Sequence, residues 1–153
     1  MPHPKNFRVR ALGEIAIRCS DMSAMVAFYE DVIGLERLSG DHNSAITFFR
    51  IAAGFDGHTQ VLALFHHKAA PRPGLHPTGD DRPVSGGNSS LHHIALSLPF
   101  DEQAAVMSWY DQIGQSYRVE TFDWIGWRGI FTEDPEGNTV EMVAYDRSML
   151  SQA

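Results

Sequence analysis

Apolar and polar positions along this chain change their period in a fixed order, and the same order occurs twice. Residues 12–19 alternate as a strand does, with two isoleucines on one face and Glu14 and Arg18 on the other. Apolar residues then recur at helical spacing over 22–32, and Gly34 supplies a C-terminal stop. Three more strands are expected over 35–38, 44–50 and 59–65, with turns over 40–43 and 53–57 between them.

The second half restarts the pattern. Residues 91–98 read as a strand that carries His93 on one face, and Asp101 is expected to cap a helix that ends at Ile113. The apolar stripe of that helix is expected to comprise Ala105, Val106, Trp109 and Tyr110. Three strands then follow over 117–122, 126–132 and 139–145.

The two halves also match residue by residue. Glu14 and His93 take equivalent places 79 residues apart, and the turn glycines Gly57 and Gly137 lie 80 residues apart. A nearly constant offset indicates an internal repeat, and a repeat decides the architecture. The sequence therefore predicts an α+β fold of two βαβββ modules.

The predicted organisation has five parts. They are a leader over 1–11, the first module over 12–66, a Pro/Gly-rich linker over 67–90, the second module over 91–146 and a polar tail over 147–153. The linker is longer than an ordinary connection, so a lid or an interface arm is a possible role for it.

Composition narrows the class of protein. With 153 residues the chain has the length of one domain or of two small halves, and its formal charge of −7 disfavours nucleic acid and anionic membranes as partners. A single cysteine, Cys19, fits a reducing compartment. No apolar run reaches membrane-spanning length, and residues 1–10 lack the apolar core of a signal peptide. We therefore expect a cytoplasmic protein.

One carboxylate stands out. Glu141 interrupts the apolar run 139–145, and burying a carboxylate without a partner is costly. An exposed strand face, a buried ion pair and a metal ion are the three explanations that the pattern leaves open.

The repeat and its motifs resemble one family. The two βαβββ units, the run from Phe28 to Leu35, and Asp134-Pro135-Glu136-Gly137-Asn138-x-x-Glu141 are similar to the vicinal oxygen chelate superfamily. That group includes glyoxalase I, bleomycin resistance proteins and extradiol dioxygenases. The resemblance implies an open, U-shaped mixed-sheet cavity, a small-molecule substrate and a homodimer.

The resemblance also implies a metal site. Carried over position by position, the expected ligands are Glu14, His93 and Glu141, and Glu14 or Glu141 is the expected proton acceptor. The fourth family position falls on an apolar residue, Val61 or Ala63. One imidazole and two carboxylates suit a divalent Fe, Mn, Zn, Ni or Co ion, and the spacing does not choose among these metals.

Further residues are candidates for substrate binding. They are Arg18, Phe49, Trp124, Trp127 and Tyr145. Arg18 would bind an anionic group or end a strand in a salt bridge, and the aromatic rings would wall a pocket or serve as core or dimer contacts.

Two functions follow from the resemblance. One is a metal-dependent lyase, isomerase or ring-cleaving dioxygenase that uses the ion as a Lewis acid. The alternative is a metal-free protein of the bleomycin-resistance type that sequesters a small molecule, with Glu14 and His93 as a hydrogen-bonded pair.

The remaining histidines are weaker candidates. Adjacent residues in a strand point to opposite faces, so at most one of His66 and His67 is expected at any one site. The same rule places His92 on the helix side of its strand, opposite His93. His3 and His76 lie in the leader and the linker.

Overall fold

The computed structural model describes residues 5–69, 73–75, 83–84 and 89–151. The chain forms two compact units, Met1–Pro83 and Val84–Ala153. Their boundary falls inside the segment predicted as a linker. His3 and His76 lie outside the described residues, as does most of that segment. No helix among the described residues has both the length and the apolar character needed to cross a bilayer.

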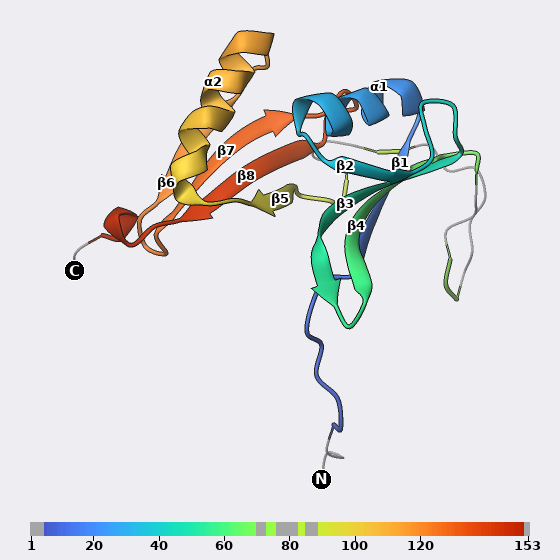
Figure 1. Ribbon diagram of the computed structural model, residues 1–153, viewed down its shortest axis with the longest axis horizontal. Coiled ribbons are helices and arrows are strands. Elements are labelled where there is room, and N and C mark those ends of the chain that lie inside the picture. The colour runs from blue at the N-terminus through green and yellow to red at the C-terminus, as the bar shows by residue number, and fades with distance from the viewer. Residues whose placement is uncertain (1–4, 70–72, 76–82, 85–88, 152–153) are drawn as a thin grey trace. The chain divides into compact units, whose positions relative to one another are not determined.

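The described residues of the first unit, blue to green in Figure 1, form one sheet and one helical segment. Its strands have the spatial order β1-β4-β3-β2, with β1 parallel to β4 and the other pairs antiparallel. Their bounds are β1 Glu14–Cys19, β2 Glu36–Ser39, β3 Ile46–Phe55 and β4 His58–His66. The helical segment comprises α1, Met22–Ala27, and the π-helical turn η1, Phe28–Val32.

Local chemistry explains where this helical segment begins and ends. The Asp21 side chain accepts a hydrogen bond from the Ala24 backbone N–H at 3.0 Å, which satisfies one of the free donors of the first turn. Gly34 has a φ of +86°, a conformation that costs other residues more than glycine. The predicted single helix is therefore confirmed in position, although its second half is wound as a π-helix.

The register of the first sheet separates its two faces. Glu14 is paired with Val61, and Val61 is paired with Arg50, so these three residues share one face. The other face carries Leu62, Phe49 and the isoleucines of β1, and it packs against α1 and η1. The core of the unit lies there and includes Met25, Val26, Tyr29, Phe49, Leu62 and Leu64, all buried.

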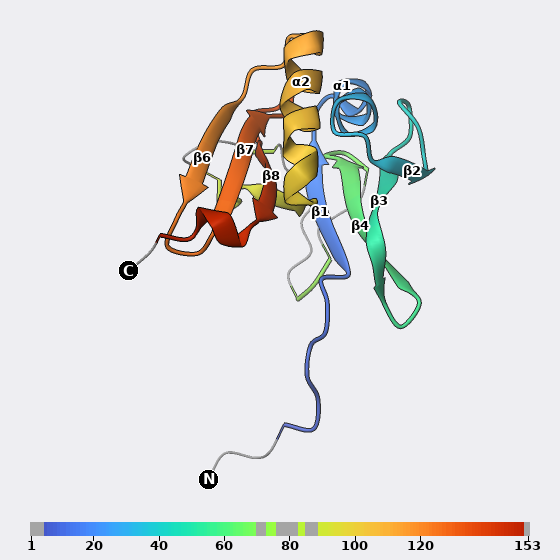
Figure 2. The same cartoon turned by 60° about the vertical axis from the view of Figure 1, so that its left-hand side comes forward.

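The second unit, yellow to red in Figure 1, repeats this order. Its sheet has the order β5-β8-β7-β6, with β5 parallel to β8. The strands are β5 Ile94–Ser97, β6 Arg118–Phe122, β7 Trp127–Glu133 and β8 Thr139–Tyr145. Helix α2, Gln103–Ile113, follows the 3-10 turn η3, Phe100–Glu102, and lies along this sheet (Figure 2). The predicted α+β architecture of two βαβββ modules is confirmed.

A buried amide ties α2 to the sheet. The Gln103 side chain donates to the backbone oxygens of Arg128, at 2.7 Å, and Met142, at 3.2 Å. Its own oxygen accepts from Arg128 Nε at 2.7 Å. Because the amide is fully buried and all its groups are bonded, it specifies how the helix sits on β7 and β8.

Three predictions about the second unit need correction. The strand expected over 91–98 is β5, which begins only at Ile94, so His92 and His93 precede it. Asp101 does not cap α2; it lies within η3, and Glu102 precedes the helix without a side-chain cap. The buried stripe of α2 centres on Gln103 and Tyr110, whereas the expected Trp109 is exposed.

Two smaller corrections concern the ends of elements. The turn expected over 53–57 is tighter, since β3 continues to Phe55 and only Asp56 and Gly57 form the turn. The segment predicted as a polar tail also includes the 3-10 turn η4, Arg147–Met149.

The turn before β8 fixes where that strand starts. The buried Asp134 carboxylate accepts hydrogen bonds from the backbone N–H of Glu136 and Asn138, at 2.9 and 3.0 Å. It also accepts one from the Asn138 side chain at 2.8 Å. Gly137 supplies the positive φ of +83°. The Asp-Pro-Glu-Gly-Asn motif thus determines the register of β8 and the place of Glu141 on it.

Candidate functional site

Glu141 lies in the middle of the second sheet on the face away from α2. Ala95 of β5 is its partner on one side and Phe131 of β7 on the other. Only 5% of its surface is exposed. The first of the three explanations, an exposed strand face, is therefore wrong, and the carboxylate needs a partner.

Gly129 makes the space that the carboxylate occupies. A Cβ at position 129 would overlap Glu141 Oε2 and would come within 2.7 Å of Phe131 Cε2. The missing side chain lets Glu141 lean across β7 toward β6, where Glu120 is paired with Gly129. A glycine in mid-strand weakens a sheet, so the space for the Glu141 carboxylate comes with a loss of strand stability.

His93 reaches the same carboxylate from the segment before β5. Its Nε2 lies 3.1 Å from Glu141 Oε1, and about a third of its side chain is exposed. The ring also meets Phe131 edge-on, with the centroids 6.2 Å apart. The structure thus brings together two of the three predicted ligands, both within the second unit.

The electrostatics of the pair are dominated by burial. Desolvation raises the pKa of the Glu141 carboxyl above its ordinary value, while the nearby His93 acts in the opposite direction and Glu120 adds a smaller upward effect. Glu120 itself contacts Arg118 at 2.8 Å. Glu141 is therefore a carboxyl group that holds a proton more readily than an exposed one, and an added positive charge nearby would favour its ionised form.

Aromatic side chains extend this face along the sheet. Trp127 is paired with Tyr145, and both share the face of Glu141. They are 43% and 57% exposed, and Trp124, in the turn between β6 and β7, is 73% exposed. Trp127 and Tyr145 thus lie where a molecule near Glu141 would extend, whereas Trp124 lies outside the strands.

The third predicted ligand, Glu14, belongs to the first unit. It begins β1, and its cross-strand neighbour is Val61. Ala63 lies two residues further along β4 on the same face, so both candidates for the fourth position are apolar neighbours on this face. Arg18 also shares the face of Glu14 and is paired with Phe65.

Phe49 is not available to a ligand on that face. It is fully buried, lies on the α1 side of the sheet and is paired with Leu62. Its ring centroid is 6.4 Å from that of Tyr29 on η1. The expectation that Phe49 walls a substrate pocket needs correction: strand alternation makes it a core residue.

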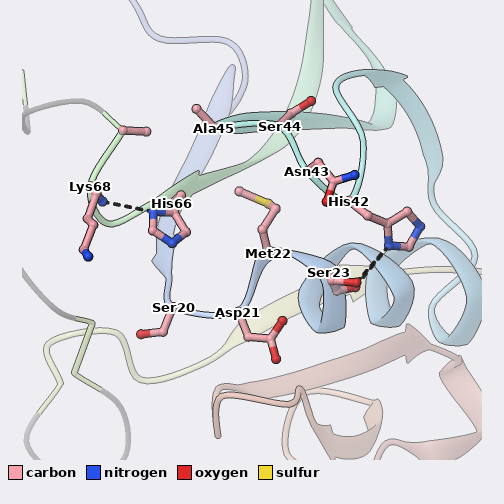
Figure 3. A pocket seen from close by; sticks show the side chains of 11 residues that line it. Ser20, Asp21, Met22, Ser23, His42, Asn43, Ser44, Ala45, His66 and Lys68 are labelled. Carbon is pink, nitrogen blue, oxygen red and sulfur yellow. Dashed lines mark hydrogen bonds between the residues drawn. The ribbon is translucent and has the colours of Figure 1, made fainter.

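His66 and His67 do not point to opposite faces as expected. β4 ends at His66, and the two rings stack with centroids 4.6 Å apart. A groove of about 660 Å³ lies beside His66 and is also lined by His42 and Met22. Figure 3 shows the imidazoles of His42 and His66 on either side of Met22. His42 contacts Ser23 rather than His66. Among the described residues of the groove, His42 and His66 thus bond to different neighbours, Ser23 and the Lys68 backbone N–H.

Several residues near Glu141 were missed by the sequence analysis. Glu120 and Gly129 become neighbours of Glu141 only through strand register, which no local pattern reveals. His92 was assigned to the helix side, yet its Nδ1 lies 2.7 Å from His93 Nδ1. The His-His pair ahead of a short strand was the available signal. Among the described residues, no three His, Cys, Asp or Glu side chains gather closely enough to hold a metal by themselves.

Comparison with known proteins gives one family. Residues 11–142 match the family model described as Glyoxalase/Bleomycin resistance protein/Dioxygenase superfamily. Comparison with curated protein sequences gives no match.

Three solved structures illustrate the similarity of fold. A lactoylglutathione lyase from Agrobacterium tumefaciens is 22% identical, with a TM-score of 0.61 over 88% of this chain and 92% of that one. A glyoxalase/dioxygenase from Nostoc punctiforme is 18% identical, with a TM-score of 0.62 over 96% and 97%. A fosfomycin resistance protein from Listeria monocytogenes is 17% identical, with a TM-score of 0.62 over 93% and 98%.

Proposed function

Because this chain belongs to the Glyoxalase/Bleomycin resistance protein/Dioxygenase superfamily, we propose that it is an enzyme that binds a divalent metal through His93 and Glu141. Members of the superfamily bind small molecules and typically use such an ion. The proposal covers lyase, isomerase and ring-cleaving dioxygenase activity on a small oxygen-bearing substrate. A cytoplasmic location and a homodimer are part of it.

The observation that supports this proposal most is the pairing of His93 with Glu141. Their atoms Nε2 and Oε1 are 3.1 Å apart. Two ligand atoms at neighbouring corners of one coordination sphere, with bonds of about 2.1 Å, have this separation. The donor set also fits, since imidazole and carboxylate both bind first-row divalent ions.

The surroundings of the pair favour a cation. Glu141 is buried, and the carboxylate of Glu120 raises its pKa further. A divalent ion would stabilise the ionised carboxylate that burial disfavours. Glu14 stays the proposed third ligand, on the strength of the family resemblance alone.

The chemistry assigned to the ion is that of a Lewis acid, which polarises a substrate oxygen and stabilises an oxyanion or enolate. The chain's own residues would do the rest. Glu141 Oε2, which lies beside Gly129 while Oε1 contacts His93, would be the oxygen that accepts a proton from carbon or oxygen. Phe131 would exclude water from one side of this carboxylate, and Trp127 and Tyr145 would contact an apolar part of the substrate.

The alternative is a metal-free protein that sequesters a small molecule. The exposed rings of Trp127 and Tyr145 on the face of Glu141 favour an aromatic or cationic ligand. In that case His93 and Glu141 would be a hydrogen-bonded pair that needs no metal.

Metal titration separates the two functions. Protein without an affinity tag would be titrated with Mn²⁺, Fe²⁺, Co²⁺, Ni²⁺ and Zn²⁺, and the bound metal would be measured. We expect one ion per chain in the wild type and a large loss of affinity in His93→Leu, Glu141→Gln and Glu14→Gln. His42→Leu, in the groove of the first unit, is the matched control and should bind normally. A wild type that takes up no metal at saturating concentrations would reject the enzyme proposal in favour of sequestration.

A further inference from the structure

Two neighbouring histidines touch each other beside the proposed metal site. His92 Nδ1 and His93 Nδ1 lie 2.7 Å apart, and the ring centroids are 4.9 Å apart at an angle of 66°. In a strand, adjacent side chains point to opposite faces and do not meet. These two meet because β5 begins only at Ile94, so the strand ladder does not constrain them.

A hydrogen bond at one nitrogen of an imidazole determines what the other nitrogen can do. The neutral ring has one N–H and one lone pair. If His93 Nδ1 donates to His92 Nδ1, then His93 Nε2 carries the lone pair. In the metal-free chain Nε2 instead donates to Glu141 Oε1, 3.1 Å away, and a metal held by both groups would take the place of that proton. The Nδ1–H tautomer of His93 is the one that a metal needs, because only a nitrogen without a proton can bind it.

The orientation of the His93 ring is fixed on two further sides. Phe131 lies edge-on to it, and Glu141 contacts its Nε2. His92 is exposed, so its contribution to the apolar core is small. A substitution at His92 therefore acts on His93 through the hydrogen bond rather than through packing.

We propose that His92 is a positioning residue: its Nδ1 accepts a hydrogen bond from His93 Nδ1 and so presents His93 Nε2 to the divalent metal held with Glu141. This inference rests on the proposed function. Metal-binding histidines almost always donate their second N–H to an acceptor, and losing that acceptor typically lowers metal affinity about 10–100-fold.

Two substitutions at His92 test the hydrogen bond itself. His92→Asn places an oxygen acceptor close to the position of Nδ1, whereas His92→Leu places a methyl group there. His42→Leu is the matched control, since His42 is also exposed and also uses its Nδ1 in a hydrogen bond, to Ser23. The measurement is Co²⁺ affinity by competition with a chelating dye, together with thermal unfolding of the metal-free variants.

We expect His92→Leu to weaken Co²⁺ binding about tenfold or more, and His92→Asn to stay within about threefold of the wild type. His42→Leu should bind as the wild type does, and all metal-free variants should unfold at nearly the same temperature. Equal affinity in His92→Leu and the wild type would overturn the inference while leaving the proposed function intact. Equal weakening in His92→Leu and His92→Asn would also overturn it, because the acceptor would then not be what matters. A wild type that binds no Co²⁺ would remove the proposed function together with this inference.

Discussion

Replacing Gly129 with alanine should disable the site while leaving the fold in place. The new Cβ would overlap Glu141 Oε2, and it would lie 2.7 Å from Phe131 Cε2 and 2.9 Å from Glu141 Cδ. Ordinary contact begins at 3.4 Å, so the phenyl ring must withdraw by at least 0.7 Å and the carboxyl carbon by at least 0.5 Å. Because the carboxylate is the free end of a flexible side chain, it moves together with the ring.

The expected energies differ for folding and for metal binding. Overpacking of this size costs about 1–3 kcal/mol, and a strand gains about 0.5–1 kcal/mol when glycine becomes alanine. The net loss of stability should therefore be about 1 kcal/mol in the metal-free protein. Metal affinity should fall at least about tenfold, since a ligand displaced by this much no longer shares a coordination sphere with His93.

Urea unfolding of the metal-free protein and Co²⁺ titration measure the two effects separately. The double variant Gly129→Ala with Glu141→Ala supplies the control, because it removes the carboxylate that the new methyl group displaces. Its loss of stability should be smaller than the sum of the two single losses. Co²⁺ binding by Gly129→Ala at wild-type affinity would refute the idea that this glycine makes room for the ligand.

Three further predictions concern stability. Tyr110→Phe should stabilise the protein or leave it unchanged in thermal unfolding, since among the described residues the buried Tyr110 hydroxyl has no hydrogen-bond partner. Asp134→Ala should cost about 2–3 kcal/mol in urea unfolding, because two backbone N–H groups of the turn lose their charged acceptor. Burial raises the pKa of the Glu141 carboxyl above its ordinary value of 4.5 in the folded, metal-free chain. The protonated carboxyl therefore makes its full contribution to stability below pH 4.5, and that contribution is lost as the pH rises through the folded-state pKa. Unfolding at a series of pH values should show this loss in the wild type but not in Glu141→Gln.

The architecture could be predicted from the sequence because its signals are local. Strand and helix periods show in each half, and the near-constant offset between Gly57 and Gly137 shows that the halves are related. The turn at Asp134 could also be predicted, since the residues that form it are contiguous. The periods and the turn depend on residues close together in the chain, and the repeat is found by comparing the two halves.

The site could be predicted only in part because its contacts depend on register. For Phe49 the sequence left a pocket wall and a core position open, because the face that it occupies follows only from the pairing of β3 with Leu62 of β4. His92 was misassigned because the strand was expected to start at 91, and alternation was applied to residues that no ladder holds. Gly129 has no special sequence signal, and its role shows only once the Glu141 side chain of β8 is placed over it.

The way in which the second sheet holds Glu141 is itself an argument for function. A carboxylate buried between Ala95 and Phe131 is less favourable than an apolar side chain of the same size would be. The chain adds to this cost with a glycine in mid-strand and a second carboxylate, Glu120, on the same face. His93, whose Nε2 lies 3.1 Å from Glu141 Oε1, offsets part of this cost. These three unfavourable choices lie at one point of the sheet, where the divalent ion of the proposed function would supply a compensating positive charge.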